Sequence, residues 1–364
     1  MSNKLEDARK IINEIDAKMA ELFEERMKAS EMVAEYKKEH GLSILDSGRE
    51  NEIIKRNSEY IKNDVIKEYY VSFLKNTMEL SKSYQSRLNE GMRVAYCGVE
   101  GAFAYIAAKK MFPQACLIAF SSFEDAYKAT ENGDCDACVL PIENSFAGDV
   151  STVMDLIFSG SLYINQVTDI SIVHNLLVNE GATLESIKEV VSHPQALAQC
   201  SSYIAKRGYE QRPYTNTALA ARLVKESGSC EIAAIASDET ASIFGLKILE
   251  GGINESKNNT TRFGVFSRVQ NKEKNNNKKM DNHFILVFTV KNEAGALAKT
   301  LDIIGSHGYN MRNLRSRPMK ELMWSYYFYI EADGNINTED GKDMLRELGA
   351  TCDRLKLAGT YVTK

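Results

Sequence analysis

Two basic residues in the N-terminal third have a spacing that suits the binding of one anion. Arg26 and Lys37 lie eleven residues apart in a helical pattern, which places them within roughly 20° of one helix face and about 16 Å apart along the axis. Arg9 precedes Arg26 by seventeen residues, so it lies about 100° off that face and about 25 Å away. We therefore expect Arg26 and Lys37 to contact one ligand, and Arg9 to reach such a ligand only from another chain.

Further polar residues follow in the same region. Asp46, Arg49 and Glu50 come at the end of a break at Gly41 to Gly48, and Ser81 and Gln85 share one face of a later helix because they are four residues apart. Each of them alone is more often a solvated or capping side chain than a catalytic one.

Three long helices must position these residues, in a stretch of about 90 residues without proline. Apolar residues recur every three or four positions from Leu5 to Phe23, which indicates a first helix. Ser47 and Glu50 fit a capping box at the start of a second helix, and a third is expected over about 64–88. Helices of this length leave apolar faces uncovered in one chain, so we expect pairing with another copy.

The polar positions resemble the pattern of the all-helical chorismate mutases, which is matched by Arg9, Glu25-Arg26, Lys37, Asp46-Ser47-Gly48-Arg49-Glu50 and Ser81-Lys82-Ser83-Tyr84-Gln85. The resemblance implies an intertwined dimer whose Arg9 enters the partner's site. It also implies the rearrangement of chorismate to prephenate, a pericyclic step that needs a held conformation and stabilised charge. The implied roles are carboxylate binding by Arg9, Arg26, Arg49 and Ser81, hydrogen bonds to the breaking ether from Lys37 and Gln85, and contacts to the ring hydroxyl from Asp46 and Glu50.

Four short strings stand out after about residue 92, where strand-sized runs alternate with helical ones. They are Gly98-Val99-Glu100-Gly101-Ala102-Phe103, Pro141-Ile142-Glu143-Asn144-Ser145, Ser192-His193-Pro194-Gln195 and Thr260-Thr261-Arg262-Phe263. The first is weak evidence for phosphate binding, because the rest of a dinucleotide fingerprint does not follow. Taken singly, Ser192 and Asn144 would be helix N-caps, His193 a first-turn residue, and Arg262 a surface charge just before a strand at 264–267.

Together with Thr217-Ala218 near a helix start, the four strings resemble the prephenate dehydratases over nearly all of residues 92–269. The resemblance implies two α/β lobes, like those of a periplasmic binding protein, with the substrate in the cleft between them. The implied reaction is loss of the ring hydroxyl and CO2 from prephenate to give phenylpyruvate. Ala104 stands where the family commonly has a serine.

The resemblance also assigns roles in this cleft. Thr261 would donate a hydrogen bond to the leaving oxygen rather than act as a full proton source, because a hydroxyl is a feeble acid near pH 7. Arg262 would bind a substrate carboxylate. Further substrate contacts would come from Asn144, Ser145, Ser192, His193, Thr217 and Phe263. His193 fits an acid and a structural hydrogen bond equally well.

The last unit, residues 283–364, has the strand and helix order of a ferredoxin-like βαββαβ module. Asn292 to Leu297, with Tyr309-Asn310-Met311 and Ser316-Arg317-Pro318, resembles the ACT regulatory domain that binds phenylalanine at a dimer interface. The implied effector-binding residues are Asn292, Gly295, Ala296, Leu297, Asn310, Ser316 and Arg317. Arg315 replaces the family's glutamate, which changes the local charge by two units and leaves the identity of the effector open.

Composition limits the other functions that this chain could have. The chain has 364 residues, with 45 basic and 50 acidic side chains and a formal net charge of -5, which disfavours nucleic acid as a partner. No apolar run approaches the roughly 18 residues that span a bilayer, and the charged N-terminus does not resemble a signal sequence, so we expect a cytoplasmic protein without a membrane segment. Cys135 and Cys138 form the only Cys-x-x-Cys pair, and buried thiols are favoured over a metal site or any cofactor.

The sequence therefore predicts a multidomain α and α/β enzyme. Its parts are a helical mutase domain at 1–90, a two-lobed dehydratase domain at 92–269, a polar linker at 270–282 and a regulatory domain at 283–364. The expected function is the rearrangement of chorismate to prephenate, followed by the conversion of prephenate to phenylpyruvate, with inhibition by phenylalanine. The expected assembly is a homodimer or a higher homo-oligomer. Two alternatives stay open, namely a dehydratase whose helices only dimerise, and a two-lobed binding protein with a sensor domain.

Overall fold

The computed structural model describes residues 4–256, 258–271, 281–319 and 325–363. Its internal contacts divide the chain into two compact units, Met1–Arg93 and Val94–Lys364. Most of the predicted linker, residues 272–280, lies outside the described residues. Because strand β12 begins at Asp281, the last two residues of the predicted linker belong to a strand instead.

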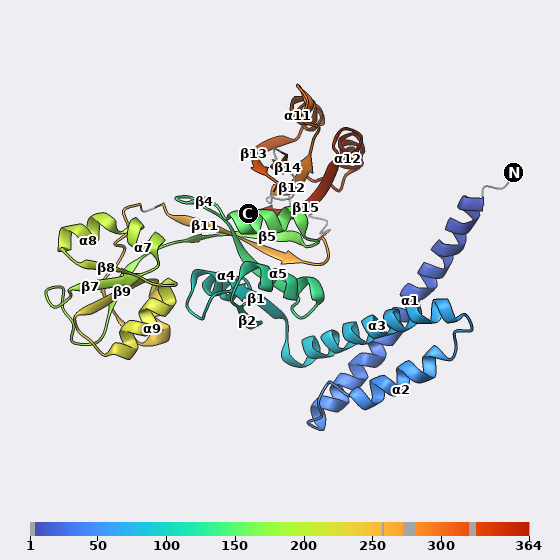
Figure 1. The fold of residues 1–364 in the computed structure, drawn as a ribbon, viewed down its shortest axis with the longest axis horizontal. Coiled ribbons are helices and arrows are strands. Elements are labelled where there is room, and N and C mark those ends of the chain that lie inside the picture. Colours follow the sequence, from blue (N-terminus) through green and yellow to red (C-terminus); the bar gives the residue numbers. More distant parts are fainter. Residues whose placement is uncertain (1–3, 257, 272–280, 320–324, 364) are drawn as a thin grey trace. The chain divides into compact units, whose positions relative to one another are not determined.

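The first unit consists of three helices, α1 (Lys4–Glu39), α2 (Ser47–Ser58) and α3 (Asp64–Glu90), and both α1 and α2 pack on α3 (Figure 1). The predicted capping box at Ser47 is wrong in its register. Asp46 is the N-cap of α2, because its Oδ1 accepts a hydrogen bond from the backbone N–H of Arg49 at 2.9 Å. Asn63 caps α3 in the same way.

Two sheets form the framework of the second unit, and the larger one has the strand order β13-β14-β12-β15-β5-β11-β3-β1-β2, with β4 paired to β3. The smaller has the order β10-β6-β9-β7-β8. The bounds of the strands are β1 (Arg93–Cys97), β2 (Cys116–Phe120), β3 (Ala137–Asn144), β4 (Gly148–Asp149), β5 (Tyr163–Ser171), β6 (Asn175–Val178), β7 (Glu189–Ser192), β8 (Glu210–Pro213), β9 (Ile232–Ala236), β10 (Lys247–Glu250), β11 (Thr260–Ser267), β12 (Asp281–Thr289), β13 (Asn310–Pro318), β14 (Tyr326–Asp333) and β15 (Arg354–Thr363).

Helices connect and cover these strands. They are α4 (Phe103–Met111), α5 (Phe123–Asn132), α6 (Ser151–Ser159), α7 (Pro194–Gln199), α8 (Ser201–Arg207), α9 (Thr217–Ser227), α10 (Asp238–Phe244), α11 (Ala296–Ser306) and α12 (Glu339–Thr351). The smaller sheet has apolar clusters that include Val190 and Ile204 on one face and Val224 and Ala236 on the other. Its runs of valine, isoleucine and alanine are typical of strands that are buried on both faces.

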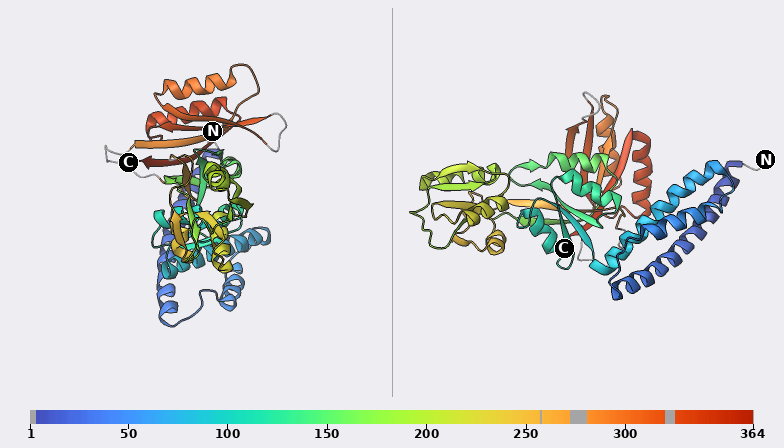
Figure 2. Two further views of the ribbon diagram at one scale, coloured as in Figure 1. Left: turned by 90° about the vertical axis from the view of Figure 1, so that its left-hand side faces the viewer. Right: turned by 60° about the horizontal axis from the view of Figure 1, so that its bottom comes forward.

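The C-terminal part follows the predicted order, with the strand, helix, strand, strand, helix, strand elements β12, α11, β13, β14, α12 and β15. Its helices α11 and α12 contact each other and lie on one face of its strands (Figure 2). Strand β15 pairs with β5 through Gly359 and Ile164, so one sheet continues from the C-terminal part into the preceding lobe. A Cβ atom at Gly359 would lie 2.3 Å from the carbonyl oxygen of Ile164, so this close pairing requires glycine.

The predictions about a membrane segment, the cysteines and a metal site can be compared with the structure. Among the described residues, none of the helices is long and apolar enough to cross a lipid bilayer. Burial raises the pKa of the Cys138 thiol to about 12, and Cys135 is buried as well. Within the described part, no group of three or more His, Cys, Asp or Glu side chains is arranged to hold a metal ion.

Candidate active sites

In the helical unit, Arg26 and Ser81 contact each other directly. Arg26 Nη1 donates a hydrogen bond to Ser81 Oγ and a longer one, 3.4 Å, to the carbonyl oxygen of Thr77. Burial lowers the pKa of Arg26, but an arginine stays protonated at neutral pH. The structure therefore places a partly buried cation between α1 and α3.

Three other predicted residues of this unit, Lys37, Glu50 and Gln85, differ in the partners that they contact. Lys37 Nζ donates to the carbonyl oxygen of Ile44 at 2.6 Å, and Glu50 pairs with Lys82 of α3 at 2.9 Å. Gln85 is buried, and its Oε1 has no hydrogen-bond partner among the described residues. A buried amide oxygen without a donor is costly, and Oε1 of Gln85 is such an acceptor among the described residues.

Arg9, Arg49 and Asp46 do not join this cluster in the single chain. Arg9 lies on the exposed N-terminal half of α1, and Arg49 pairs with Glu52 at 2.7 Å on the surface. Asp46 serves as the cap of α2 described above. The same half of α1 exposes a row of large apolar side chains, namely Leu5, Ile12, Ile15, Met19 and Leu22, each 43–63% exposed.

In the second unit, a cavity of about 210 Å³ lies between the two lobes. Thr261 and Asn144 line it from the strands of the larger sheet, while His193 and Thr217 line it from the lobe built on the smaller sheet. The other lining residues are Ala102, Phe103, Ile172, His174, Gln195, Ala196, Gln199 and Asn216. The structure thus brings together four of the predicted cleft residues.

Asn144 holds Thr261 in a defined orientation. Asn144 Nδ2 donates to Thr261 Oγ1 at 2.8 Å, and Asn144 Oδ1 accepts from the backbone N–H groups of Phe146 and Ala147. Asn144 is thus the cap of a turn, not of a helix. Since the amide N–H occupies a lone pair of the Thr261 oxygen, the hydroxyl proton of Thr261 is available to donate to another group.

The polar groups that line this cavity carry no permanent positive charge among the described residues. Burial lowers the pKa values of His174 and His193, which favours their neutral forms. Helices α4 and α9 begin at the cavity, with Phe103 and Thr217 as their first residues. Backbone N–H groups at helix N-termini attract anions, so the cavity offers neutral donors for carboxylates.

Four predicted cleft residues do not line the cavity. Ser192 is fully buried and donates to the carbonyl oxygen of Ile235, so it joins β7 to β9. His193, rather than Ser192, is the N-cap of α7, since its Nδ1 accepts from the backbone N–H of Gln195 at 3.2 Å. Phe263 is buried in the core. Ser145 is exposed and bonds to the backbone of residues 258 and 260.

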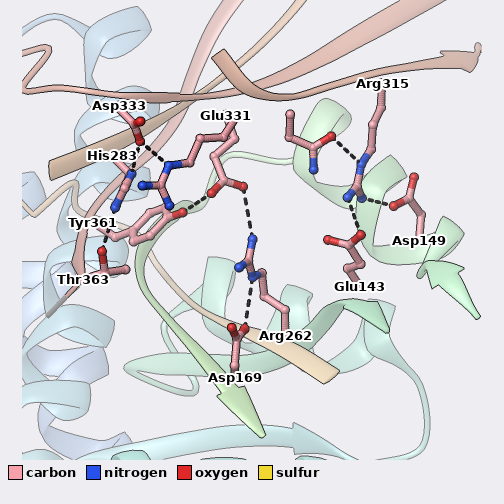
Figure 3. Close-up of polar contacts among 12 residues, drawn as sticks. Glu143, Asp149, Asp169, Arg262, His283, Arg315, Glu331, Asp333, Tyr361 and Thr363 are labelled. Atoms are coloured by element: carbon pink, nitrogen blue, oxygen red, sulfur yellow. Dashed lines mark hydrogen bonds and ion pairs between the residues drawn. The ribbon is translucent and has the colours of Figure 1, made fainter. Parts of the chain in front are cut away.

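Arg262, the fourth, differs from the prediction for a geometric reason. The strand was expected to start at Gly264, but β11 starts at Thr260, and successive side chains of a strand point to opposite faces. Arg262 therefore faces away from Thr261 and pairs with Asp169 at 3.1 Å and Glu331 at 3.6 Å (Figure 3). Burial alone would lower the pKa of Arg262, but these two carboxylates outweigh it and raise the pKa.

The predicted effector residues are spread over the C-terminal part. Asn292 and Gly295 are exposed in the turn between β12 and α11, at the same end of the sheet as Ser316. Asn310 lies six residues from Ser316 along β13, about 20 Å away, and donates to Asp333. The structure therefore does not place Asn310 with the others.

The two basic residues of this segment contact the preceding lobe instead. Arg317 donates to the hydroxyl of Tyr327 at 3.1 Å and pairs with Asp155 of α6 at 3.6 Å. Arg315 pairs with Glu143 of β3 at 2.7 Å and with Asp149 (Figure 3). The arginine that replaces the expected glutamate thus has two acidic partners in the lobe that carries Thr261.

Among the polar residues of the cavity that the sequence did not single out are His174 and Gln199. His174 and Asn175 interrupt an apolar run, a pattern in which the histidine is more often a core residue than a ligand. Gln199 lies four residues beyond the string that ends at Gln195, as the last residue of α7. The signal that would have indicated both is their position relative to the lobes, which the sequence does not show.

Two family models match this chain. The family model described as chorismate mutase type II matches residues 8–86, and the one described as prephenate dehydratase matches residues 94–271. The chain is 31% identical to the bifunctional chorismate mutase/prephenate dehydratase of Neisseria gonorrhoeae over 98% of this chain and 96% of that protein.

Two solved structures are similar to the second unit. The prephenate dehydratase of Arthrobacter aurescens in complex with L-Phe matches with a TM-score of 0.67 and 26% identity, covering 74% of this chain and 89% of that one. GqqA, described as a novel type of quorum-quenching acylase, matches with a TM-score of 0.68 and 28% identity, covering 75% of this chain and 98% of that one.

Proposed function

The chain belongs to the bifunctional chorismate mutases/prephenate dehydratases, and we propose that it rearranges chorismate to prephenate between its helices and converts prephenate to phenylpyruvate in the cavity around Thr261. The observation that carries the second activity is the contact between Asn144 and Thr261, since it leaves the hydroxyl proton of Thr261 free to donate within a cavity lined by neutral polar groups. The full-length match to a relative with both activities in its name supports the first.

The dehydration needs little from the protein besides orientation. The C–C bond to the ring carboxylate breaks, its electron pair forms a ring double bond, CO2 departs, and the C–O bond breaks with its pair on oxygen. Prephenate dianion thus gives phenylpyruvate anion, CO2 and hydroxide. Thr261 donates to the departing oxygen while negative charge develops there, which lowers the barrier without full proton transfer. The hydroxide then takes its proton from solvent.

The substrate carboxylates are bound without Arg262 in this proposal. The N-termini of α4 and α9 supply backbone N–H groups at the cavity, and Thr217 adds a hydroxyl. Arg262 instead supports β11 through Asp169 and Glu331. His193 caps α7 through Nδ1. In this proposal it lines the cavity and does not act as an acid.

For the rearrangement, we propose that Arg26 and Ser81 bind a carboxylate and that Lys37 and Gln85 donate to the ether oxygen. Gln85 is buried, and its amide NH2 group would supply the hydrogen-bond donor. Arg9 would complete the site from a second copy of the chain, which would also cover the apolar row of α1. Asp46, Arg49 and Glu50 would complete it from the start of α2.

The C-terminal part is proposed to act as an ACT regulatory domain that binds phenylalanine. Its strand order and helices fit the ferredoxin-like plan, and the relative from Arthrobacter aurescens is described as a complex with L-Phe. The proposed binding segment is Asn292 to Leu297 with Ser316 of the other copy's sheet. The ion pairs of Arg315 and Arg317 would carry its effect to the catalytic lobe.

One assay tests the whole proposal. Purified protein is given chorismate, and prephenate and phenylpyruvate are followed separately with and without millimolar phenylalanine. Phenylpyruvate formation that phenylalanine suppresses is the expected result. Dehydration of supplied prephenate without consumption of chorismate would mean that the helices only dimerise. No turnover of either substrate would refute the enzymatic assignment.

A further inference from the structure

His174 lies where the chain passes from one lobe to the other. It lies between β5 and β6, in one of the two segments that connect the sheets, and its carbonyl oxygen accepts from the backbone N–H of Ile253 in the other segment. Its side chain is only 2% exposed and lines the cavity that contains Thr261. The ring of Phe103 packs edge-on against it at 5.9 Å. The imidazole is therefore fixed from several sides.

The hydrogen bonding of this imidazole defines its tautomer. His174 Nε2 lies 2.8 Å from Gln199 Oε1, and because that oxygen only accepts, Nε2 carries the proton. Nδ1 is then an acceptor, and it has no partner in the described part of the chain. Burial, opposed only by the bond to Gln199, lowers the pKa of His174, which keeps the ring neutral.

Prephenate offers one way to satisfy this acceptor. With both carboxylates ionised and a ketone in its side chain, its only hydrogen-bond donor is the ring hydroxyl. The same oxygen must accept from Thr261 as it departs. A hydroxyl can donate one hydrogen bond and accept two, so these contacts are compatible.

We propose that His174 Nδ1 accepts a hydrogen bond from the ring hydroxyl of prephenate and so presents that oxygen's lone pair to Thr261. This assignment rests on the proposed dehydratase function. Neutral His174 has no proton on Nδ1, so it is a substrate-positioning group and not the acid. Gln199 acts through it as a positioning residue, because its Oε1 fixes the tautomer.

Two substitutions test the acceptor in the full-length enzyme. His174→Leu removes it, and we expect kcat/KM for prephenate to fall about tenfold to a hundredfold. His174→Asn keeps a carbonyl oxygen on a short side chain and should recover part of that loss. The mutase reaction of the same chain serves as the internal control, because it takes place in the helical unit.

A prephenate analogue with hydrogen in place of the ring hydroxyl separates positioning from general damage. It lacks the group that contacts His174, so as a competitive inhibitor it should bind the wild type and His174→Leu within about twofold of each other. An equal weakening of the analogue and of prephenate turnover, or wild-type kcat/KM in His174→Leu, would overturn the assignment. Failure of the wild type to dehydrate prephenate would instead refute the proposed function itself.

Discussion

The guanidinium of Arg315 lies 2.7 Å from the carboxylate of Glu143 and also pairs with Asp149 (Figure 3). Arg315 belongs to β13 of the C-terminal part, whereas Glu143 directly precedes Asn144 on β3. The Arg315 side chain is only 14% exposed. The ion pair therefore joins the proposed regulatory part to the strand whose asparagine holds Thr261.

Arg315→Gln should weaken both stability and regulation. It leaves Glu143 and Asp149, which face each other across β3 and β4, without their shared cation, and we expect a loss of about 1–3 kcal/mol in the free energy of unfolding. The concentration of phenylalanine that halves dehydratase activity should rise several-fold. Arg312→Gln is the matched control, because Arg312 pairs with Asp333 within the C-terminal part. An equal shift in both variants would contradict the coupling.

Thr261→Ala should stop the second reaction and spare the first. Without the hydroxyl that Asn144 orients, the departing oxygen loses its donor, and kcat should fall about a hundredfold to a thousandfold. Chorismate should then be converted to prephenate, which accumulates and can be followed by chromatography. Thr261→Ser keeps the hydroxyl and should retain much of the activity. Undiminished phenylpyruvate output from Thr261→Ala would remove Thr261 from the mechanism.

The motif around Thr261 shows what the sequence can and cannot predict. Its string identified the residue, because a specific run of types is local information. The face of Arg262 depends on where β11 begins, and pairing with β3 and β5 extends that strand back to Thr260. Tertiary pairing outweighed the local pattern. Arg262, which was expected to bind a substrate carboxylate, therefore pairs with Glu331 instead.

Cavity residues that belong to no motif could not be predicted from the sequence for a similar reason. His174 comes to the cavity because two connecting segments pair between the lobes, through contacts such as Ile172 N–H to the carbonyl oxygen of Asn259. In contrast, the helices were predictable, since periodicity and proline absence are local. The third helix, expected over about 64–88, spans Asp64–Glu90, whereas α1 continues to Glu39, well beyond the apolar pattern that ended at Phe23.

Arg26→Ala should abolish the rearrangement and leave dehydration of supplied prephenate intact. The partly buried guanidinium and its bond to Ser81 form the proposed carboxylate site, and the loss of a charge-assisted contact to an anion costs several kcal/mol. Separate assays with chorismate and with prephenate give the two rates. Parallel loss of both activities in a folded variant would argue against two independent sites.

Ile15→Glu should dissociate the proposed dimer of helical units. The side chain is 50% exposed in the single chain, and a charge within a paired apolar face costs far more than one in water. Sedimentation analysis should show a smaller species, and the mutase rate should fall with it. Lys10→Glu, about 140° around the helix from Ile15, is the control and should keep the wild-type mass. An unchanged mass together with an unchanged mutase rate in Ile15→Glu would place the interface of the helical units elsewhere.

Arg9 gives the sharpest test of a shared site, because it lies about 25 Å along α1 from Arg26. If Arg9 acts in the partner's site, a heterodimer of Arg9→Ala and Arg26→Ala chains contains one intact site, which combines Arg26 of the first chain with Arg9 of the second. Mixing the two inactive variants under exchange conditions should then restore mutase activity, up to about a quarter of the wild-type rate per site if half of the dimers are mixed. If both residues acted within one chain, every site in the mixture would lack one arginine, and no activity would return.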